Sequence, residues 1–227
     1  MWSQFMMQNF PIIAKWGPVM YPIILGSIVG LAIMVERFWF LTVRRARIFP
    51  RRLLMEVQDR VARGESNEAV TACKRDGSSL ARILLAGLSY HRARREVIRE
   101  KLEDVGRHEA AGLEKYLALL GTITAVEPLL GLLGTVTGMI KMFNVIGAEG
   151  PGNPAHLAVG IAEALITTAG GLTVAIPCYL AYRWFMSRVG RIVQEMEDQA
   201  LVLLDQLQAE EGRFEAEPAG GREANQP

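Results

Sequence analysis

The stretch "LAVGIAEALITTAGGLTVAIPCYL", residues 157–180, holds a single charged side chain, Glu163. The hydrocarbon core of a bilayer is ~30 Å thick and is crossed by about 20 apolar helical residues, so this stretch predicts a membrane-spanning helix. A carboxylate near the middle of such a helix costs ~2.5–3.5 kcal/mol. Glu163 is therefore expected to face other protein groups or a wet cavity.

Two further stretches have the same character. Residues 17–35, "GPVMYPIILGSIVGLAIMV", contain no charge, and residues 116–148 are interrupted only by Glu127 and Lys141. Three such stretches in 227 residues favour membrane helices over buried helices of a globular core. A cleaved signal peptide is the weaker interpretation of the first stretch, because it has no basic n-region and no small-x-small cleavage site.

We therefore expect an all-α membrane protein with three transmembrane helices, two of them long and extending into the cytoplasm. The predicted organisation is a periplasmic segment 1–16, a first span 17–43, a cytoplasmic helical domain 44–115, a second span 116–148, a periplasmic turn 149–154, a third span 155–185, a helical extension 186–209 and a disordered tail 210–227.

The distribution of basic residues predicts the orientation. Residues 44–115 contain 17 Lys and Arg against 11 Asp and Glu, whereas residues 1–16 contain only Lys15 and the turn at 149–154 contains none. Connections rich in Lys and Arg stay on the cytoplasmic side. The N-terminus is thus expected to be periplasmic and the C-terminus cytoplasmic.

Glycine and serine positions divide the cytoplasmic segment into helices. Gly64 and Gly77 are expected to end short helices, and Ser66 and Ser79 to begin the next ones. From Ala93 the chain has no proline until Pro128, which predicts one helix that runs from Ala93 into the second span and on to Ile146, ~80 Å at 1.5 Å per residue.

The third helix is predicted to begin with Asn153 as its cap and Pro154 as its first residue, and Pro177 is expected to kink it. Beyond the membrane, apolar residues recur at spacings of four and three, as in a coiled-coil seam. This seam fits either the protein's own second helix or another subunit. Its members are Val189, Val193, Met196, Ala200, Leu203 and Leu207.

Small and hydroxylated residues form stripes on the membrane helices. The pairs Gly26–Gly30 and Gly134–Gly138 have the small-xxx-small spacing that lets helix backbones approach closely. A helical wheel places one stripe on the second span and one on the third. The stripes consist of Thr124, Gly131, Thr135 and Gly138, and of Glu163, Thr167, Gly170 and Val174 with Thr168 at its flank.

No catalytic or metal-binding pattern is present in the sequence. His91, His108 and His156 are scattered, and Cys73 and Cys178 are far apart and are expected to be free thiols. We expect no enzyme activity, no cofactor and no metal. The net charge of +1 gives no reason to expect a nucleic-acid partner.

The segment "PLLGLLGTVTGMIKMF" (128–143), followed by "GIAEALITTAGGLTVAIP" (160–177), closely resembles the paired signature of the ExbB/TolQ/MotA proton-channel family. The first span and the helical segment at 64–88 are similar to ExbB-type members, so the resemblance covers residues 17–205. Three spans rather than four point to the ExbB and TolQ branch.

The resemblance implies a homopentamer in the bacterial inner membrane that surrounds an ExbD/TolR-like single-span protein, whose aspartate carries the proton. A TonB/TolA-like protein is a further partner that it suggests. The polar pore positions of the family map onto Thr135, Glu163 and Thr168, with Thr167 and Thr124 as further pore-lining candidates. The process that is energised, and the choice between proton and sodium, stay open.

Two interpretations of the carboxylate compete. Glu163 belongs either to a proton path or to a non-conducting scaffold in which a neutral Glu hydrogen-bonds across helices. Glu127 departs from the family pattern, which more often has a small residue before the proline, and is expected at the cytoplasmic interface. Lys141 is expected to extend toward the outer surface.

Overall fold

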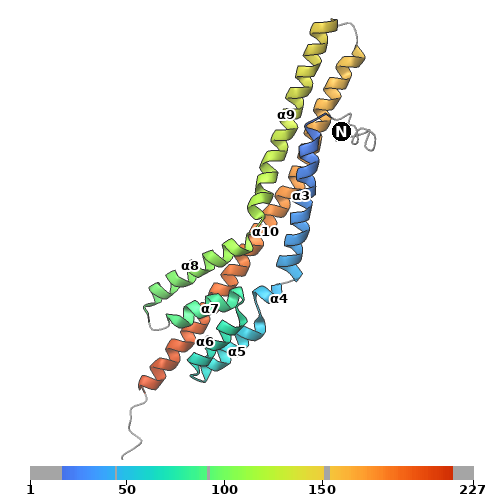
Figure 1. The fold of residues 1–227 in the computed structure, drawn as a ribbon. Helices are drawn as coiled ribbons and strands as arrows, with labels where there is room; N and C mark the ends of the chain where they lie inside the picture. The colour runs from blue at the N-terminus through green and yellow to red at the C-terminus, as the bar shows by residue number, and fades with distance from the viewer. Residues whose placement is uncertain (1–16, 44, 91–92, 151–153, 217–227) are drawn as a thin grey trace, which may run out of the picture. The chain divides into compact units, whose positions relative to one another are not determined.

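The computed structural model describes residues 17–43, 45–90, 93–150 and 154–216 (Figure 1). The predictions for residues 1–16, Asn153 and residues 217–227 therefore lie outside the described residues. Within the described ranges all regular secondary structure is helical. The prediction of an all-α membrane protein is confirmed.

Three of the described helices are long and apolar enough to cross a membrane, over Met20–Val43, Leu117–Gly147 and Ala158–Gln206. The helices in chain order are α3 (Met20–Phe38), a π-helical turn η1 (Trp39–Val43), α4 (Arg45–Ile48), α5 (Arg51–Ala62), α6 (Ser66–Asp76), α7 (Ser79–Ser89), α8 (Arg95–Leu113), α9 (Leu117–Glu149) and α10 (Pro154–Ala216).

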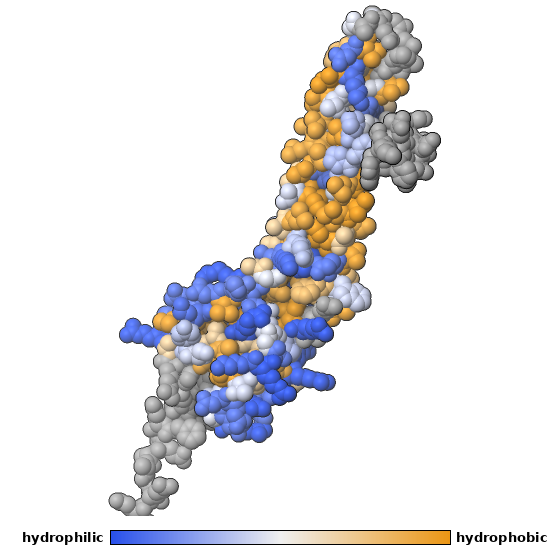
Figure 2. Space-filling model, viewed as in Figure 1, coloured by the Kyte–Doolittle hydropathy of each residue, from blue (hydrophilic) through white to orange (hydrophobic). Residues whose placement is uncertain are grey.

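The chain divides into two compact units. The membrane unit comprises Met1–Phe38 and Tyr116–Met186, and the charged unit comprises Trp39–Lys115 and Ser187–Pro227. Hydrophobic residues cover α3, α9 and the first part of α10, whereas hydrophilic residues dominate the surface of α5 to α8 (Figure 2). This contrast is expected if lipid surrounds one unit and water the other.

Helices α3, α9 and α10 pack together in the membrane unit. Val19, Met20 and Ile23 are buried there, and Leu130 of α9 and Val174 of α10 pack against them. Other large apolar side chains point outward. Leu25, Leu129 and Leu165, for example, are 63%, 63% and 64% exposed. An outer face of this kind suits contact with lipid tails.

Consecutive helices of the charged unit pack against each other, α5 on α6, α6 on α7 and α7 on α8. Gly77 ends α6 with a φ of 66°, a left-handed conformation that glycine adopts without strain. The cap of α7 is Ser78, whose side chain accepts a hydrogen bond from the Ala81 amide at 3.2 Å. The predicted start at Ser79 is therefore correct, but the capping residue precedes it.

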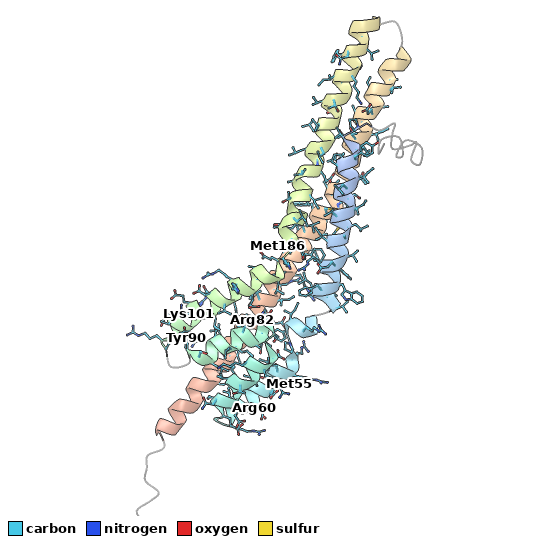
Figure 3. The ribbon with its side chains drawn as sticks, in the orientation of Figure 1. Met55, Arg60, Arg82, Tyr90, Lys101 and Met186 are labelled. Carbon is cyan, nitrogen blue, oxygen red and sulfur yellow. The ribbon has the colours of Figure 1, made fainter. Side chains whose placement is uncertain are left out.

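An ion pair joins α7 to α8 inside the charged unit. The Arg82 guanidinium, labelled in Figure 3, donates two hydrogen bonds to the Glu109 carboxylate, one of them 2.5 Å from Nη2 to Oε2. Burial disfavours the charged form of Glu109, but the hydrogen bonds from Arg82 and Ser79 outweigh it and hold the pKa of this carboxyl below its usual range.

The apolar seam of α10 packs within its own chain. Its residues from Val189 to Leu203 are buried. Neighbouring positions of the same helix contact α7 and α8, since Leu204 lies against Gly87 and Glu197 lies against Gly106. Within the chain, this part of α10 thus packs on α7 and on α8, and α8 is the first part of the predicted second helix.

The expected continuous helix from Ala93 to Ile146 is wrong. Helix α8 ends at Leu113, and Tyr116 has a φ of 68°, a conformation that costs an L-residue roughly 1–2 kcal/mol. The Arg37 guanidinium lies 5.2 Å from the centre of the Tyr116 ring. Gly112 lies in the last turn of α8, but the residue with the positive φ is Tyr116, a residue type that does not signal a helix break in a sequence pattern.

The far end of α10 also differs from the prediction. The helix continues to Ala216, whereas the sequence predicts that it ends at Ala209 and gives way to a disordered tail. The first helical residue is Pro154, as predicted. Proline suits that position because the first amides of a helix have no partner within the helix.

Candidate functional site

Glycines bring α9 and α10 into backbone contact. A Cβ placed on Gly138 would lie 2.9 Å from the Gly160 carbonyl oxygen and 3.0 Å from the Ala164 Cβ, and one placed on Gly134 would overlap the Thr167 side chain. Real Cβ atoms do not approach this closely. The prediction that Gly134 and Gly138 form a close-packing face is therefore confirmed, and the face that they contact is on α10 of the same chain.

One predicted threonine bonds across this contact. The Thr168 hydroxyl donates to the Gly131 carbonyl oxygen of α9 at 3.0 Å. Thr167 is 1% exposed, and its hydroxyl donates within α10 to the carbonyl oxygens of Glu163 and Ala164 at 3.0 and 2.9 Å. Both hydroxyls thus lie at the α9–α10 contact, one turn from Glu163.

Glu163 is paired with a cation. The Lys141 ammonium on α9 lies 2.5 Å from Glu163 Oε1, with the two side chains 49% and 12% exposed. Lys141, which is predicted to extend toward the outer surface, thus pairs with Glu163 of α10. Either charge alone would be costly in an apolar region.

The segment that precedes α3 also contacts the Glu163 carboxylate. Gly17 has a φ of 82°, and a Cβ at this position would overlap Glu163 Oε1. Glycine is thus needed here both for its backbone conformation and for space. Glu163 consequently lies where α9, α10 and the segment that precedes α3 meet.

The sequence contained a signal for the Lys141 partnership. Gly134, Gly138 and Lys141 follow one another at spacings of four and three, so they share one face of α9. The first two of these residues contact α10. Lys141 on the same face therefore also faces α10, and Glu163 is the only carboxylate in residues 157–180 of α10.

The other two predicted positions bond locally. Thr135 donates to the Leu132 carbonyl oxygen at 2.7 Å and Thr124 to that of Gly121 at 2.6 Å, both within α9. At 1.5 Å per residue, Thr124 lies ~16 Å before Thr135 along the helix axis. The structure therefore brings Glu163, Thr167 and Thr168 together at one contact, and does not bring Thr124 to them.

Glu127 is buried among the helices of the membrane unit. The residue is 2% exposed, and its carboxyl group lies against Gly26 of α3. Gly26 is the central residue of the uncharged stretch 17–35. The Glu127 side chain, which the sequence predicts at the cytoplasmic interface, is thus buried between α9 and α3 in the membrane unit.

The chemistry of the site at Glu163 is that of a titratable ion pair. A carboxylate can bind a proton, a lysine ammonium can stabilise its ionised form, and hydroxyls can relay hydrogen bonds without a fixed charge. Over the described part of the chain, no three His, Cys, Asp or Glu side chains gather in a group that could hold a metal ion.

The model of the MotA/TolQ/ExbB proton channel family matches residues 76–198, which include Lys141, Glu163 and the four threonines discussed above. The chain is 38% identical over 179 residues to the ExbB-like 1 protein of Synechocystis sp., a match that covers 76% of this chain and 68% of that protein. It is 31% identical over 184 residues to the Tol-Pal system protein TolQ of Haemophilus influenzae, covering 74% of this chain and 78% of TolQ.

Proposed function

Because the chain belongs to the MotA/TolQ/ExbB proton channel family, we propose that Glu163 and Lys141 form the site at which this inner-membrane channel subunit takes up and releases a proton. The observation that carries the proposal is the 2.5 Å ion pair between Lys141 Nζ and Glu163 Oε1. It holds an ionisable carboxylate in a stretch that is otherwise free of charge.

Protonation changes the forces at this site. When a proton adds to the Glu163 carboxylate, the acid becomes neutral while Lys141 keeps its charge, so the pair goes from net zero to net positive. The attraction between α9 and α10 at this point then weakens. A proton gradient can in this way act on helix packing, because each proton that binds to Glu163 weakens its attraction to Lys141 and each proton that leaves restores it.

The hydroxyls next to the pair support transfer along the contact. Thr167 and Thr168 follow Glu163 by one turn, and Thr168 already bonds across to α9. In the proposed path they relay hydrogen bonds between water molecules or a partner's acid and Glu163. Thr135, on the predicted stripe of α9, is the third hydroxyl of this path.

The assembly that we propose rests on the family resemblance. Five copies of the chain surround an ExbD/TolR-like single-span protein, whose aspartate exchanges the proton with Glu163, and a TonB/TolA-like protein receives the resulting motion. The charged unit and the C-terminus face the cytoplasm, as the excess of Lys and Arg in residues 44–115 indicates. Native mass spectrometry of the extracted complex is expected to show five copies, and a monomer at all concentrations would contradict the proposal.

The test of the proton role is Glu163→Gln. The complex is purified from its native membrane with its partner and reconstituted in liposomes, and proton uptake driven by a membrane potential is followed with an entrapped pH dye. Glutamine keeps the size and hydrogen bonds of glutamate but cannot ionise. Uptake is expected to fall to the rate of empty liposomes while the yield of assembled complex is unchanged.

A matched control is Glu36→Gln. Glu36 also lies at a membrane helix and is paired with a cation, Arg37 Nε at 2.5 Å, but its side chain is 48% exposed and far from the α9–α10 contact in sequence. This variant is expected to keep full proton uptake. Equal loss in both variants would mean that any lost carboxylate disturbs the complex.

A scaffold without conduction is the second candidate. It is favoured by the glycine contacts and the Thr168 hydrogen bond, which hold α9 to α10 without any titration. Interhelical hydrogen bonds in membranes average only ~0.6 kcal/mol, so a scaffold should tolerate Glu163→Gln. Proton uptake by the unaltered complex no faster than in empty liposomes would leave the scaffold as the better account.

A further inference from the structure

Glu127 lies where three membrane helices meet. Its carboxyl group packs on Gly26 of α3, and a Cβ at Gly26 would overlap Glu127 Oε1. Its backbone packs on α10, since a Cβ at Gly171 would lie 2.5 Å from the Glu127 carbonyl oxygen. Gly26 of α3 therefore leaves the space that the carboxyl group occupies, and Gly171 of α10 leaves space for the Glu127 backbone carbonyl.

The carboxyl group has no partner of opposite charge. Glu127 Oε2 is buried and lacks a hydrogen-bond partner among the described residues, and Glu127 takes part in none of the ion pairs found there. On α10 the Cys178 thiol lies near enough for the charge of Glu127 to act on it, and on α3 the carboxyl group contacts Gly26. An ionised Glu127 would thus be an uncompensated charge.

The helix itself provides an acceptor beside the carboxyl group. Pro128 has no amide hydrogen, and an interior proline removes the hydrogen bond to the carbonyl four residues earlier, which here is that of Thr124. A protonated carboxyl group is a hydrogen-bond donor, whereas a carboxylate only accepts. The Thr124 carbonyl, which cannot accept a hydrogen bond from residue 128, is thus available to a protonated acid one turn away.

This position is separate from the ion pair at Glu163. Lys141, the partner of Glu163, follows Glu127 on α9 by ~21 Å at 1.5 Å per residue. Glu163 contacts Gly17 before α3 begins, whereas Glu127 contacts Gly26 within α3. The two carboxyl groups thus occupy different depths of the membrane unit and different contacts.

We propose that Glu127 is a second proton-binding site of this chain, which holds its proton between the helices of the membrane unit and releases it only when Gly26 of α3 moves away from the carboxyl group or water enters. Proton release at Glu127 is then coupled to the packing of α3 on α9. The proposal goes beyond the function assigned to Glu163 and does not depend on it, because the glycines that Glu127 contacts, Gly26 and Gly171, are partners of neither Lys141 nor Glu163.

Infrared spectroscopy distinguishes the two protonation states directly. The full chain is reconstituted in lipid at neutral pH, and the spectrum of Glu127→Gln is subtracted from that of the unaltered chain. We expect the loss of one C=O stretching band of a protonated carboxylic acid. In the same experiment Glu163→Gln is the matched control, and it should remove the bands of an ionised carboxylate instead.

Two results would overturn the proposal. One is the loss of carboxylate bands, rather than the acid band, in Glu127→Gln. The other is a difference spectrum without any acid band for a variant whose helix content matches that of the unaltered chain. If Glu127→Gln does not fold, Glu127→Ala serves as the second variant, because a small residue at this position relieves the contact with Gly26.

Discussion

Lys141 of α9 and Glu163 of α10 form an ion pair 2.5 Å long, and Glu163 is the only charged residue between positions 157 and 180. The two residues are 22 positions apart and meet because glycines let their helices approach. This one pair both joins the helices and supplies the group that a proton can bind. A double-mutant cycle measures the first of these roles, the contribution of the pair to the stability of the chain.

Lys141→Met is expected to destabilise the chain, because it leaves the largely buried Glu163 carboxylate without a counter-charge. Glu163→Gln in the same chain should restore most of the loss. The coupling energy of residues in contact is ~0.5–3 kcal/mol. Thermal unfolding of the detergent-solubilised variants, followed by circular dichroism, gives this energy. Strictly additive effects of the two substitutions would show that the pair contributes nothing.

Thr168→Val tests the hydroxyl that crosses to α9. Valine keeps the shape and drops the hydrogen bond to Gly131, so stability should fall by only ~0.6 kcal/mol while proton uptake falls severely. Thr173→Val is the matched control, since Thr173 donates to the Ala169 carbonyl of its own helix. Similar uptake in the two variants would exclude a specific role for Thr168.

Gly138→Ala probes the backbone contact between α9 and α10. The added Cβ would meet the Gly160 carbonyl at 2.9 Å and the Ala164 Cβ at 3.0 Å, so the helices must separate and the yield of folded chain should drop. Gly147→Ala in the same helix meets nothing within 4 Å. It should be neutral or stabilising by up to ~1 kcal/mol, as alanine favours helix. Equal yields would contradict the packing argument.

Glu109→Gln addresses the stability of the charged unit as a function of pH. Because the folded-state pKa of Glu109 is lowered, its contribution is present above the unfolded pKa of ~4.3 and is lost as the pH falls through the folded value. The variant should be less stable at neutral pH by about 1 kcal/mol, since Arg82 is half-exposed. In strong acid the two chains should unfold alike; a difference that persists there would refute this assignment.

The orientation of the chain can be tested with Arg60→Cys and an impermeant thiol reagent in intact cells. The native thiols of Cys73 and Cys178 should not react with the reagent, because both are buried. Burial together with the nearby charges of Asp76 and Glu56 also raises the pKa of Cys73 to about 11, which keeps it in the unreactive thiol form. The new cysteine should react only after the cells are permeabilised. Reaction from outside would reverse the proposed topology.

Much of the fold follows from the sequence alone. The three spans, the divisions of the charged segment near Gly64 and Gly77, and the first helical residue Pro154 are all as predicted. These features depend on local properties of the chain, such as apolar length, glycine conformation and the missing proline amide, which a linear pattern contains. The same holds for the close-packing face of Gly134 and Gly138, because helical periodicity alone aligns the two residues.

The tertiary structure decided the partners of the charged side chains. The sequence predicted a functional carboxylate at Glu163, but only the approach of α9 and α10 shows that Lys141 pairs with it. Likewise Glu127 is buried because Gly26 and Gly171 of two other helices leave room for it, and Tyr116 breaks a helix beside Arg37. Burial and pairing depend on groups that are distant along the chain, and the cost of a charge is set by those neighbours rather than by its own position in the sequence.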